Sequence, residues 1–383
     1  MVRFGHVSCQ HHSNGYYAAY ADLAAHELDA VIHCGDYIYE STYSAVRDVP
    51  LPEPVTLEQY RNVYALYKGD PDLQAAHAAA PWIVTWDDHE VEDNYKGTTP
   101  GAGSRTPDTV SFLARRAAAY RAWWEHMPVR LRPPTGPDSR IYREVGFGDL
   151  ARVYVLDTRQ YRTDQSCAAG AAVFEDVGPR YSESYGPDFT VLGTRQERWL
   201  DRALGMAGPT RHHRRRLRRR PPVRWNVLAQ QIVVQQWRFA AGDDAPFSLD
   251  QWDGYPAARD RLLGSLSGVE NAVVLTGDVH SSWVADLGLD FDDPASEVVG
   301  TEFVATSVSS SGSALEPVVP LILSGDPHIR WGEAGPHGWN RHEVTRDEWR
   351  AEHRYVDDVT VPGSPTRVGR TWVLPAGGRV AEA

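Results

Sequence analysis

The stretch HCGDYIYE, residues 33–40, ends an apolar run (AVIH, 30–33) with a glycine, a bare carboxylate at Asp36 and a phenol at Tyr39. A short, continuous apolar run of this kind is typical of a strand buried inside a sheet. Packing gives no reason for a charge and a phenol directly after such a strand. In α/β sheets, ligands bind beyond the carboxyl ends of the strands. The stretch therefore indicates both a buried strand and a functional site at its end.

Four other predicted strands also end in polar residues. These residues are Cys9 after RFGHVS, Asp87-Asp88-His89 after WIVTW, Asp278 and His280 after AVVLTG, and Asp157 and Arg159 after ARVYVL. If these strands are neighbours, the side chains converge at one edge. Several carboxylates at close range cannot all stay ionised without compensation, which metal cations would provide.

Each of these features also has a simpler interpretation. A Gly-Asp pair after a strand is usually a turn, and a buried Cys9 can act as a small hydrophobic residue. Residues 87–90 could open a helix, where acidic groups suit the helix dipole. Arg159 could pair with a neighbouring carboxylate. Because five strand ends share the pattern, a common site is the favoured hypothesis.

The composition is that of a folded, non-membrane protein. The chain has 383 residues, of which 42% are hydrophobic and 23% charged, and no window has the ~18 uncharged apolar residues of a membrane helix. Strand-like and helical segments alternate without a composition break, which favours one α/β domain over residues 1–383, with 341–383 as edge strands or a tail. No signal peptide is visible, so the chain as written is expected in the cytoplasm unless upstream sequence is missing.

Cysteine and charge content narrow the function. Cys9, Cys34 and Cys167 are too few for a disulfide framework, so buried thiols or a metal thiolate are expected. The net charge of −12 does not favour nucleic acid as a partner. The stretch RHHRRRLRRRPPVR, residues 211–224, is the exception. It lacks interleaved aromatic residues, so a solvated basic loop is the favoured interpretation and a polyanion-binding patch the alternative.

Three motifs in order resemble a known superfamily: GDxxY from Asp36 to Tyr39, DDHE from Asp87 to Glu90, and GDVH from Gly277 to His280. They are similar to the motifs of binuclear metallophosphoesterases. With Cys9, LDTRQYR, WNVLAQQ and EFVATS, the chain most resembles the PhoD-like alkaline phosphatase/phosphodiesterase family, up to about residue 360. The resemblance implies a four-layer sandwich of two mixed β-sheets flanked by helices. The signal sequence and the N-terminal Ig-like β-sandwich domain common in that family are not seen in this chain.

The resemblance also implies a metal centre of Fe(3+) with Ca(2+) alongside, with Asp36 bridging the metals. The implied ligands are Cys9, Asp36, Tyr39 and His280 around the iron, and Asp88, Asn94 and Asp278 on the calcium side. Thiolate, phenolate and imidazole suit a transition metal, whereas carboxylate and amide oxygens suit calcium.

The resemblance assigns His89 as the general acid and Arg159 as the group that stabilises charge on the phosphoryl oxygens. Asp157 would orient Arg159 or serve the fold, and Asp253 in the WDG loop would support the site or the fold.

The function implied is hydrolysis of phosphomonoesters or phosphodiesters by a metal-activated hydroxide. The alternative is a non-catalytic polyanion-binding protein on the same scaffold, which only the Arg-rich segment supports. That segment, 211–220, is also the one feature that would suit a polyanionic substrate such as nucleic acid. A zinc enzyme of another class is disfavoured, because these residues do not form a usual tetrahedral zinc set.

Overall fold

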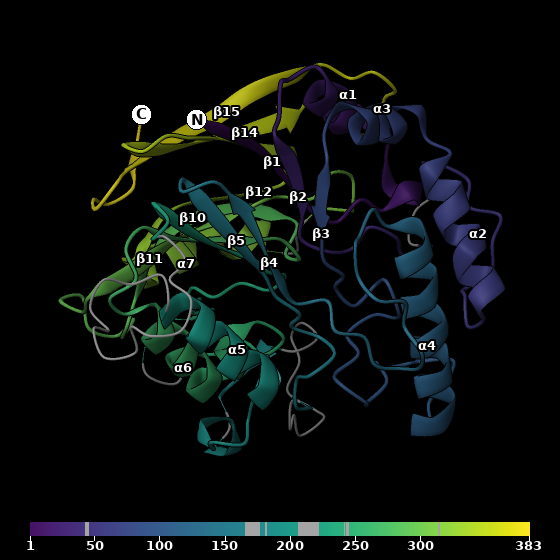
Figure 1. The fold of residues 1–383 in the computed structure, drawn as a ribbon, viewed down its shortest axis with the longest axis horizontal. Coiled ribbons are helices and arrows are strands. Elements are labelled where there is room, and N and C mark those ends of the chain that lie inside the picture. The colour runs from purple at the N-terminus through teal and green to yellow at the C-terminus, as the bar shows by residue number, and fades with distance from the viewer. Residues whose placement is uncertain are drawn as a thin grey trace.

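The computed structural model describes residues 1–42, 46–164, 177–180, 182–205, 222–240, 242, 245–312 and 315–383. Two seven-stranded mixed sheets lie at its centre. Figure 1 shows helices α1 and α3 outside the first sheet and α5 and α6 outside the second. The predicted four-layer arrangement of two mixed sheets flanked by helices is therefore confirmed.

The first sheet has the order β16-β15-β14-β13-β1-β2-β3, in which β1, β2 and β3 are parallel and the other pairs antiparallel. Its strands are β1 (Val2–Val7), β2 (Ala30–His33), β3 (Trp82–Val84), β13 (His337–Val344), β14 (Glu348–Val356), β15 (Thr366–Pro375) and β16 (Ala381–Glu382).

Residues 341–383 contribute more than the predicted edge strands or tail. Strand β13 lies inside the first sheet, between β14 and β1, and pairs antiparallel with β1 from Val2↔Val344 to His6↔Asn340. Strand β1 therefore pairs with β13 on one side and with β2 on the other.

The second sheet has the order β12-β10-β11-β9-β7-β5-β4, and β5, β7, β9 and β11 are parallel. The strands β4 and β5 form an antiparallel hairpin. The strands of this sheet, and of a small separate sheet made of β6 and β8, are β4 (Arg143–Phe147), β5 (Ala151–Val155), β6 (Val177–Gly178), β7 (Trp225–Ala229), β8 (Phe247–Ser248), β9 (Ala272–Thr276), β10 (Ser281–Gly288), β11 (Val298–Val304) and β12 (Ile329–Ala334).

The α-helices described are α1 (Ala18–Ala24), α2 (Leu57–Lys68), α3 (Pro71–Ala79), α4 (Thr109–His126), α5 (Gly193–Gly205), α6 (Pro256–Leu266) and α7 (Val319–Gly325). Side-chain caps fix where three of them begin. Thr56 and Gln59 form a capping box on α2, and the carboxylates of Asp70 and Asp108 accept backbone N–H bonds at the starts of α3 and α4. No helix in the described ranges is both long and apolar enough to cross a membrane.

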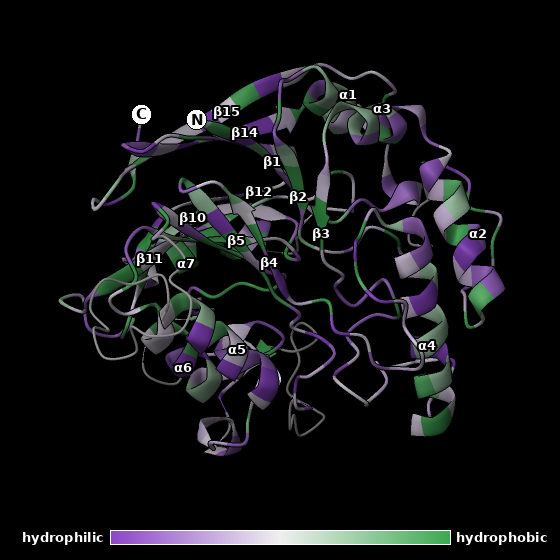
Figure 2. Ribbon diagram, viewed as in Figure 1, coloured by the Kyte–Doolittle hydropathy of each residue, from purple (hydrophilic) through white to green (hydrophobic). Residues whose placement is uncertain are grey.

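The hydrophobic core continues between the two sheets. One buried cluster contains Phe4 and Ile32 from the first sheet and Val227, Leu275 and Phe303 from the second. Figure 2 shows largely hydrophobic strands in both sheets and mixed hydropathy along α4 and α5. Burial on both faces holds the parallel strands in place, so their polar ends are fixed relative to one another.

Three fully buried imidazoles, His6, His342 and His353, lie on β1, β13 and β14 of the first sheet. Nε2 of His342 is 3.4 Å from Nδ1 of His6, and Trp349 donates a 2.9 Å hydrogen bond to Nδ1 of His342. Within the described residues, neither ring nitrogen of His353 has a hydrogen-bond partner. Burial lowers the pKa of His6 and of His353 to about 3 and that of His342 well below its usual value.

These histidines predict a loss of stability in acid. The unfolded chain takes up protons below about pH 6.5 whereas the folded chain does not, so the free energy of unfolding falls as pH drops from 6.5 toward 3. At pH 5 each such imidazole lowers it by about 2 kcal/mol relative to pH 8. Urea unfolding from pH 8 to pH 5 measures this dependence.

Two substitutions test whether the buried histidines cause the loss of stability in acid. His353→Leu is expected to unfold in acid less readily than the wild type. Asn340→Leu makes a similar polar-to-apolar change at another fully buried position, without a titrating group. This control should keep the pH dependence of the wild type. Equal pH slopes in the wild type and in His353→Leu would contradict the assignment.

Candidate functional site

The polar strand ends meet where the two sheets join. Ser8, after β1, and Ser307, after β11, form an isolated parallel bridge between the sheets. The backbone N–H of Cys9 donates to the carbonyl of Gly35 (3.1 Å), and that of Gln10 donates to the carbonyl of Asp36 (3.0 Å). The segments after β1, β2 and β11 are therefore tied to one another at a single edge.

The backbone at this edge is strained at the predicted metal ligands. Five of them have a left-handed backbone: Cys9 (φ 56°), Asp36 (59°), Asn94 (52°), Asp278 (66°) and His280 (51°). Among the other non-glycine residues that the structure describes, only Asn271 has a positive φ. This conformation costs an L-residue roughly 1–2 kcal/mol, and such strain concentrates at functional sites. The strained backbone positions thus lie almost entirely at or beside one cluster.

Three groups of potential metal-binding atoms lie in this cluster, and Asp36 belongs to all three. In each group the ligand atoms lie within 4.8 Å of one another, as metal ligands must. The groups are Cys9, Asp36 and His280; Asp36, Asp88 and His89; and Asp36, Asp87, Asp88 and Asp278. The structure therefore brings together most of the predicted ligands and adds Asp87, which sequence analysis placed at a strand end without a role.

Tyr39 and Asn94 reach the cluster by hydrogen bonds. The hydroxyl of Tyr39 donates to Oδ2 of Asp36 at 3.0 Å and lies 3.2 Å from Nε2 of His280. The backbone N–H of Asn94 donates to Oδ2 of Asp88 at 2.6 Å. Tyr39 thus borders the cysteine-containing group and Asn94 the carboxylate group.

The chemistry of the donors fits cations. Among the described residues, Asp36 Oδ1, Asp87 Oδ2 and Asp88 Oδ1 are buried oxygens without a hydrogen-bond partner. Burial, together with Asp88, Glu90 and Asp278, raises the pKa of Asp36 well above its usual value. Burial likewise raises the pKa of the Cys9 thiol, and the charge of Asp36 adds to this effect. Metal cations would offset both the lost solvation and the repulsion between carboxylates.

His280 is suited to ligation through one nitrogen. Burial lowers its pKa to about 3, so the ring is neutral. Its Nδ1 lies 2.9 Å from the carbonyl oxygen of Ser311, which can only accept, so Nδ1 carries the proton. This leaves Nε2, near Tyr39, with its lone pair available to a metal.

Glu90, the last residue of DDHE, received no role from sequence analysis, and the structure gives it one. Its side chain is fully buried. Oε2 accepts from the backbone N–H of Asp36 (3.0 Å) and of Asp87 (2.8 Å), and Oε1 accepts from that of Tyr37 (2.8 Å). One carboxylate therefore clamps together the segments after β2 and β3.

Glu40, the last residue of the opening stretch, was also missed. Its Oε2 lies 2.8 Å from Nδ1 of His89, and its Oε1 accepts from the backbone N–H of Asp93 at 3.0 Å. The rings of His89 and Tyr39 stack with centroids 4.1 Å apart. Burial acts to lower the pKa of His89, but Glu40, Asp36 and Asp88 together raise it well above its usual value. Glu40 therefore holds His89 at Nδ1, which leaves Nε2 on the side of Asp93.

Arg159 is fully buried among carboxylates. Its Nε donates to Asp87, its Nη1 and Nη2 each donate to Asp250 at 3.0 Å, and Nη2 also donates to Asp278 at 3.1 Å. The guanidinium therefore already contacts ligands of the cluster, with four of its five N–H groups used in these bonds.

The two other acidic candidates, Asp157 and Asp253, make contacts outside the metal-binding groups. Asp157 accepts from the backbone N–H of Arg159 (3.1 Å) and of Gln160 (3.0 Å), so it shapes the turn rather than holding the guanidinium. Asp253 pairs with Arg180 and Arg259 and lies in none of the three metal-binding groups.

The cluster reaches solvent beside His89. The side chain of Asp93 is 45% exposed and that of His89 12%, whereas that of Asp87 is 1% exposed. Asp93 and His89 thus lie on a solvent-facing side of the cluster and Asp87 on its buried side.

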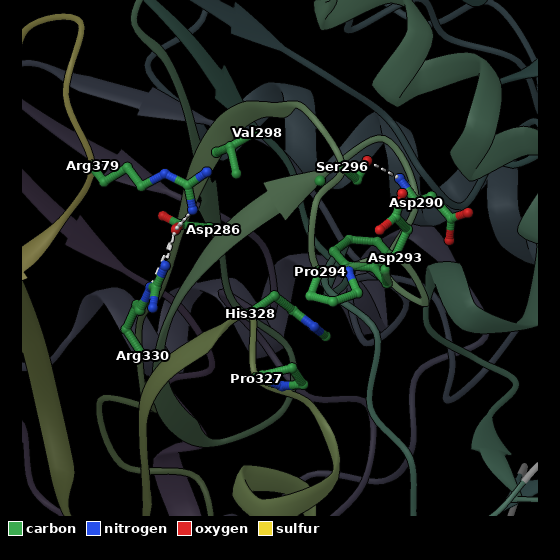
Figure 3. A pocket seen from close by; sticks show the side chains of 12 residues that line it. Asp286, Asp290, Asp293, Pro294, Ser296, Val298, Pro327, His328, Arg330 and Arg379 are labelled. Atoms are coloured by element: carbon green, nitrogen blue, oxygen red, sulfur yellow. Dashed lines mark hydrogen bonds and ion pairs between the residues drawn. The ribbon is translucent and has the colours of Figure 1, made fainter.

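A pocket near the far end of β10 is separate from this cluster. Figure 3 shows the carboxylate of Asp286 between Arg330 and Arg379, with His328 and Pro294 on the adjoining wall. Both arginines pair with Oδ2 of Asp286, at 2.5 and 3.4 Å. The metal-binding groups found in the described part of the chain do not include these residues. Cys167 and the Arg-rich segment 211–220 lie outside the described residues.

A family model and a curated relative link this chain to phosphatases. The model of the PhoD-like phosphatase family matches residues 4–353. Alkaline phosphatase D of Bacillus subtilis (strain 168) is 43% identical over 375 residues, which are 95% of this chain and 60% of that protein. This chain thus spans less than two thirds of the length of that relative.

Two solved structures are also similar. The structure of PhoD matches with a TM-score of 0.89 and 40% identity, covering 100% of this chain and 71% of that one. A purple acid phosphatase from yellow lupin (Lupinus luteus) seeds matches with a TM-score of 0.53 over 98% of this chain and 53% of its own. At 12% identity, the lupin enzyme is similar in fold alone.

Proposed function

Because this chain belongs to the PhoD-like phosphatase family, we propose that it hydrolyses phosphoric esters at a metal centre built on Asp36. The observation that carries the proposal is that Asp36 belongs to all three groups of potential metal ligands. We extend the proposal to one catalytic domain made by both sheets, because a single buried cluster joins them.

The proposed metals are Fe(3+) and Ca(2+). Cys9, Asp36, Tyr39 and His280 would hold the iron, because thiolate, phenolate and imidazole suit a transition metal. Oxygen ligands suit calcium, and these are Asp36, Asp88, Asn94 and Asp278, with Asp87 as an added candidate. When bound, the cations would supply Lewis acidity and a nucleophile derived from water.

The side chains around the metals have separate proposed roles. His89 would donate a proton to the leaving alkoxide, with Glu40 holding its Nδ1 at 2.8 Å. Arg159 would position Asp87 and Asp278 through the hydrogen bonds it makes to both. It would thus act on the phosphoryl group through the metal ligands rather than by direct contact.

Hydrolysis of p-nitrophenyl phosphate and of bis-p-nitrophenyl phosphate at alkaline pH tests the function. We expect turnover of at least one ester, loss of turnover when a chelator removes the metals, and recovery with Fe(3+) and Ca(2+). The ratio of the two rates gives the preference for monoester or diester. Turnover by a protein stripped of metal, or none by a fully loaded one, would contradict the proposal.

The same preparation tests the iron assignment. A ferric ion bound by Tyr39 and Cys9 gives a visible ligand-to-metal charge-transfer band, so the loaded protein should be coloured. Colourless, active protein containing only zinc or manganese would refute iron and leave the hydrolase proposal standing.

A further inference from the structure

A serine that is not a metal ligand contacts the phenol of Tyr39. Ser310 follows β11, and its side chain is buried. Its hydroxyl donates a 2.8 Å hydrogen bond to the Tyr39 oxygen. The same Ser310 oxygen accepts the backbone N–H of His11 at 3.1 Å. Because a serine hydroxyl has one proton, that proton is committed to Tyr39.

The backbone around Ser310 is tied to the segment that carries Cys9. The backbone N–H groups of Ser309 and Ser310 both point to the Cys9 carbonyl, at 3.4 and 3.3 Å. The hydroxyl of Ser307 donates to the Ser310 carbonyl at 2.9 Å, and His337 Nε2 lies 2.7 Å from the same carbonyl. Ser310 is thus held from both sides, so its hydroxyl has a fixed position relative to Tyr39.

The Tyr39 ring is also held. It stacks with the rings of His11 and His89, with centroids 4.3 and 4.1 Å away. Its oxygen lies between Ser310 and the group formed by Cys9, Asp36 and His280. One side of the phenol oxygen therefore receives the serine proton while the other faces the metal-binding atoms.

We propose that Ser310 is a positioning residue that orients the Tyr39 oxygen toward the metal and limits the electron density it donates. This inference rests on the proposed function, in which Tyr39 binds ferric iron. Hydrogen-bond partners of metal ligands orient those ligands and tune the metal. A hydrogen bond lowers the energy of the oxygen lone pairs, so its removal brings them closer in energy to the empty metal orbitals. The charge-transfer band then moves to longer wavelength.

The test compares absorption spectra of iron-loaded variants at equal iron content. In Ser310→Ala the band is expected to move to longer wavelength, and iron affinity to fall about 10-fold or more. Ser310→Cys, whose S–H is a weaker donor, should give a smaller shift, and it serves as the test if the Ala variant does not fold. Ser310→Thr keeps the hydroxyl, so its charge-transfer band should lie at the wild-type position.

Ser309→Ala is the matched control. Ser309 is equally buried, but its hydroxyl donates to the carbonyl of His11 (3.1 Å) and not to Tyr39. The charge-transfer band of Ser309→Ala should stay at the wild-type position. An unchanged band in both Ser310→Ala and Ser310→Cys, beside a coloured wild type, would overturn the role of Ser310 alone. A colourless ferric-loaded wild type would overturn this inference together with the iron assignment.

Discussion

Replacing Asp36 with Asn is expected to lower phosphoesterase activity by about 10³-fold or more, because as the proposed ligand shared by both metals it would supply several kcal/mol of transition-state stabilisation. Asn keeps the volume of the side chain and tolerates the left-handed backbone at φ 59°, so the change removes mainly charge. Metal analysis of the purified variant should show less than the wild-type content of both iron and calcium.

Asp286→Asn is the matched control for this prediction. Asp286 and Asp36 are both buried, at 1% and 2% exposed, but Asp286 pairs with Arg330 and Arg379 and belongs to none of the metal-binding groups. This variant should keep its metal content and its activity even if it unfolds more easily. If Asp36→Asn kept the full metal content and activity, Asp36 would not be a metal ligand that the three groups share.

In the metal-free protein, Asp36→Asn is expected to stabilise the fold. Burial and the neighbouring carboxylates disfavour the charged form of Asp36, so this charge destabilises the fold when no cation is present. We therefore expect metal-free Asp36→Asn to be more stable to urea than the metal-free wild type. Such a site is optimised for function at the expense of stability.

The strand ends were predictable because their signal is local. The strand Ala30–His33 is a continuous buried apolar run, so Asp36 was expected just beyond its end. Parallel strands bring their carboxyl ends to one edge, and this places Cys9, Asp36 and Asp87 together without any knowledge of the loops. These two facts account for the members of the metal-binding groups that follow the first sheet, whereas Asp278 and His280 follow β9 of the second sheet.

The supporting residues were not predictable in the same way, because their partners are distant in the chain. Glu40 and His89 are 49 residues apart, Arg159 and Asp250 are 91 apart, and Ser310 and Tyr39 are 271 apart. Nothing local to a lone Glu or Ser distinguishes it from a surface residue. The pairing of β13 with β1 is similarly remote, so the C-terminal strands were taken for an edge.

Arg159 illustrates how charge balance in three dimensions adds a second candidate role to the one expected from sequence. From sequence, an arginine at a strand end in a phosphatase-like chain suggests contact with phosphate. In the fold, four carboxylates lie within 3.6 Å of its guanidinium: Asp87, Asp88, Asp250 and Asp278. A buried arginine with this many partners is held rigidly, and leaving those carboxylates unpaired would be costly. Its number of partners, which only the structure provides, favours a positioning role.

His89 has two possible roles that make different predictions. It lies in one metal-binding group with Asp36 and Asp88, as a ligand would. It is also paired with Glu40 through Nδ1 and lies near the exposed Asp93, as a general acid would. A ligand holds the metal whatever the substrate is. The contribution of a general acid to the rate depends on the basicity of the leaving group, and it is large for an alkoxide and small for a nitrophenolate.

His89→Asn is therefore expected to lower kcat by about 10²–10⁴-fold for an alkyl phosphate such as glycerol phosphate, and far less for p-nitrophenyl phosphate. The nitrophenolate leaves readily without a proton, whereas an alkoxide does not. Glu40→Gln should show the same dependence on leaving group with a smaller loss, because it weakens the support of the imidazolium without removing it. His11→Asn, which alters the other ring stacked on Tyr39, should affect the two substrates equally. Unchanged metal content in His89→Asn, together with the unequal losses, would identify the acid. Loss of metal with equal losses on both substrates would identify His89 as a ligand instead.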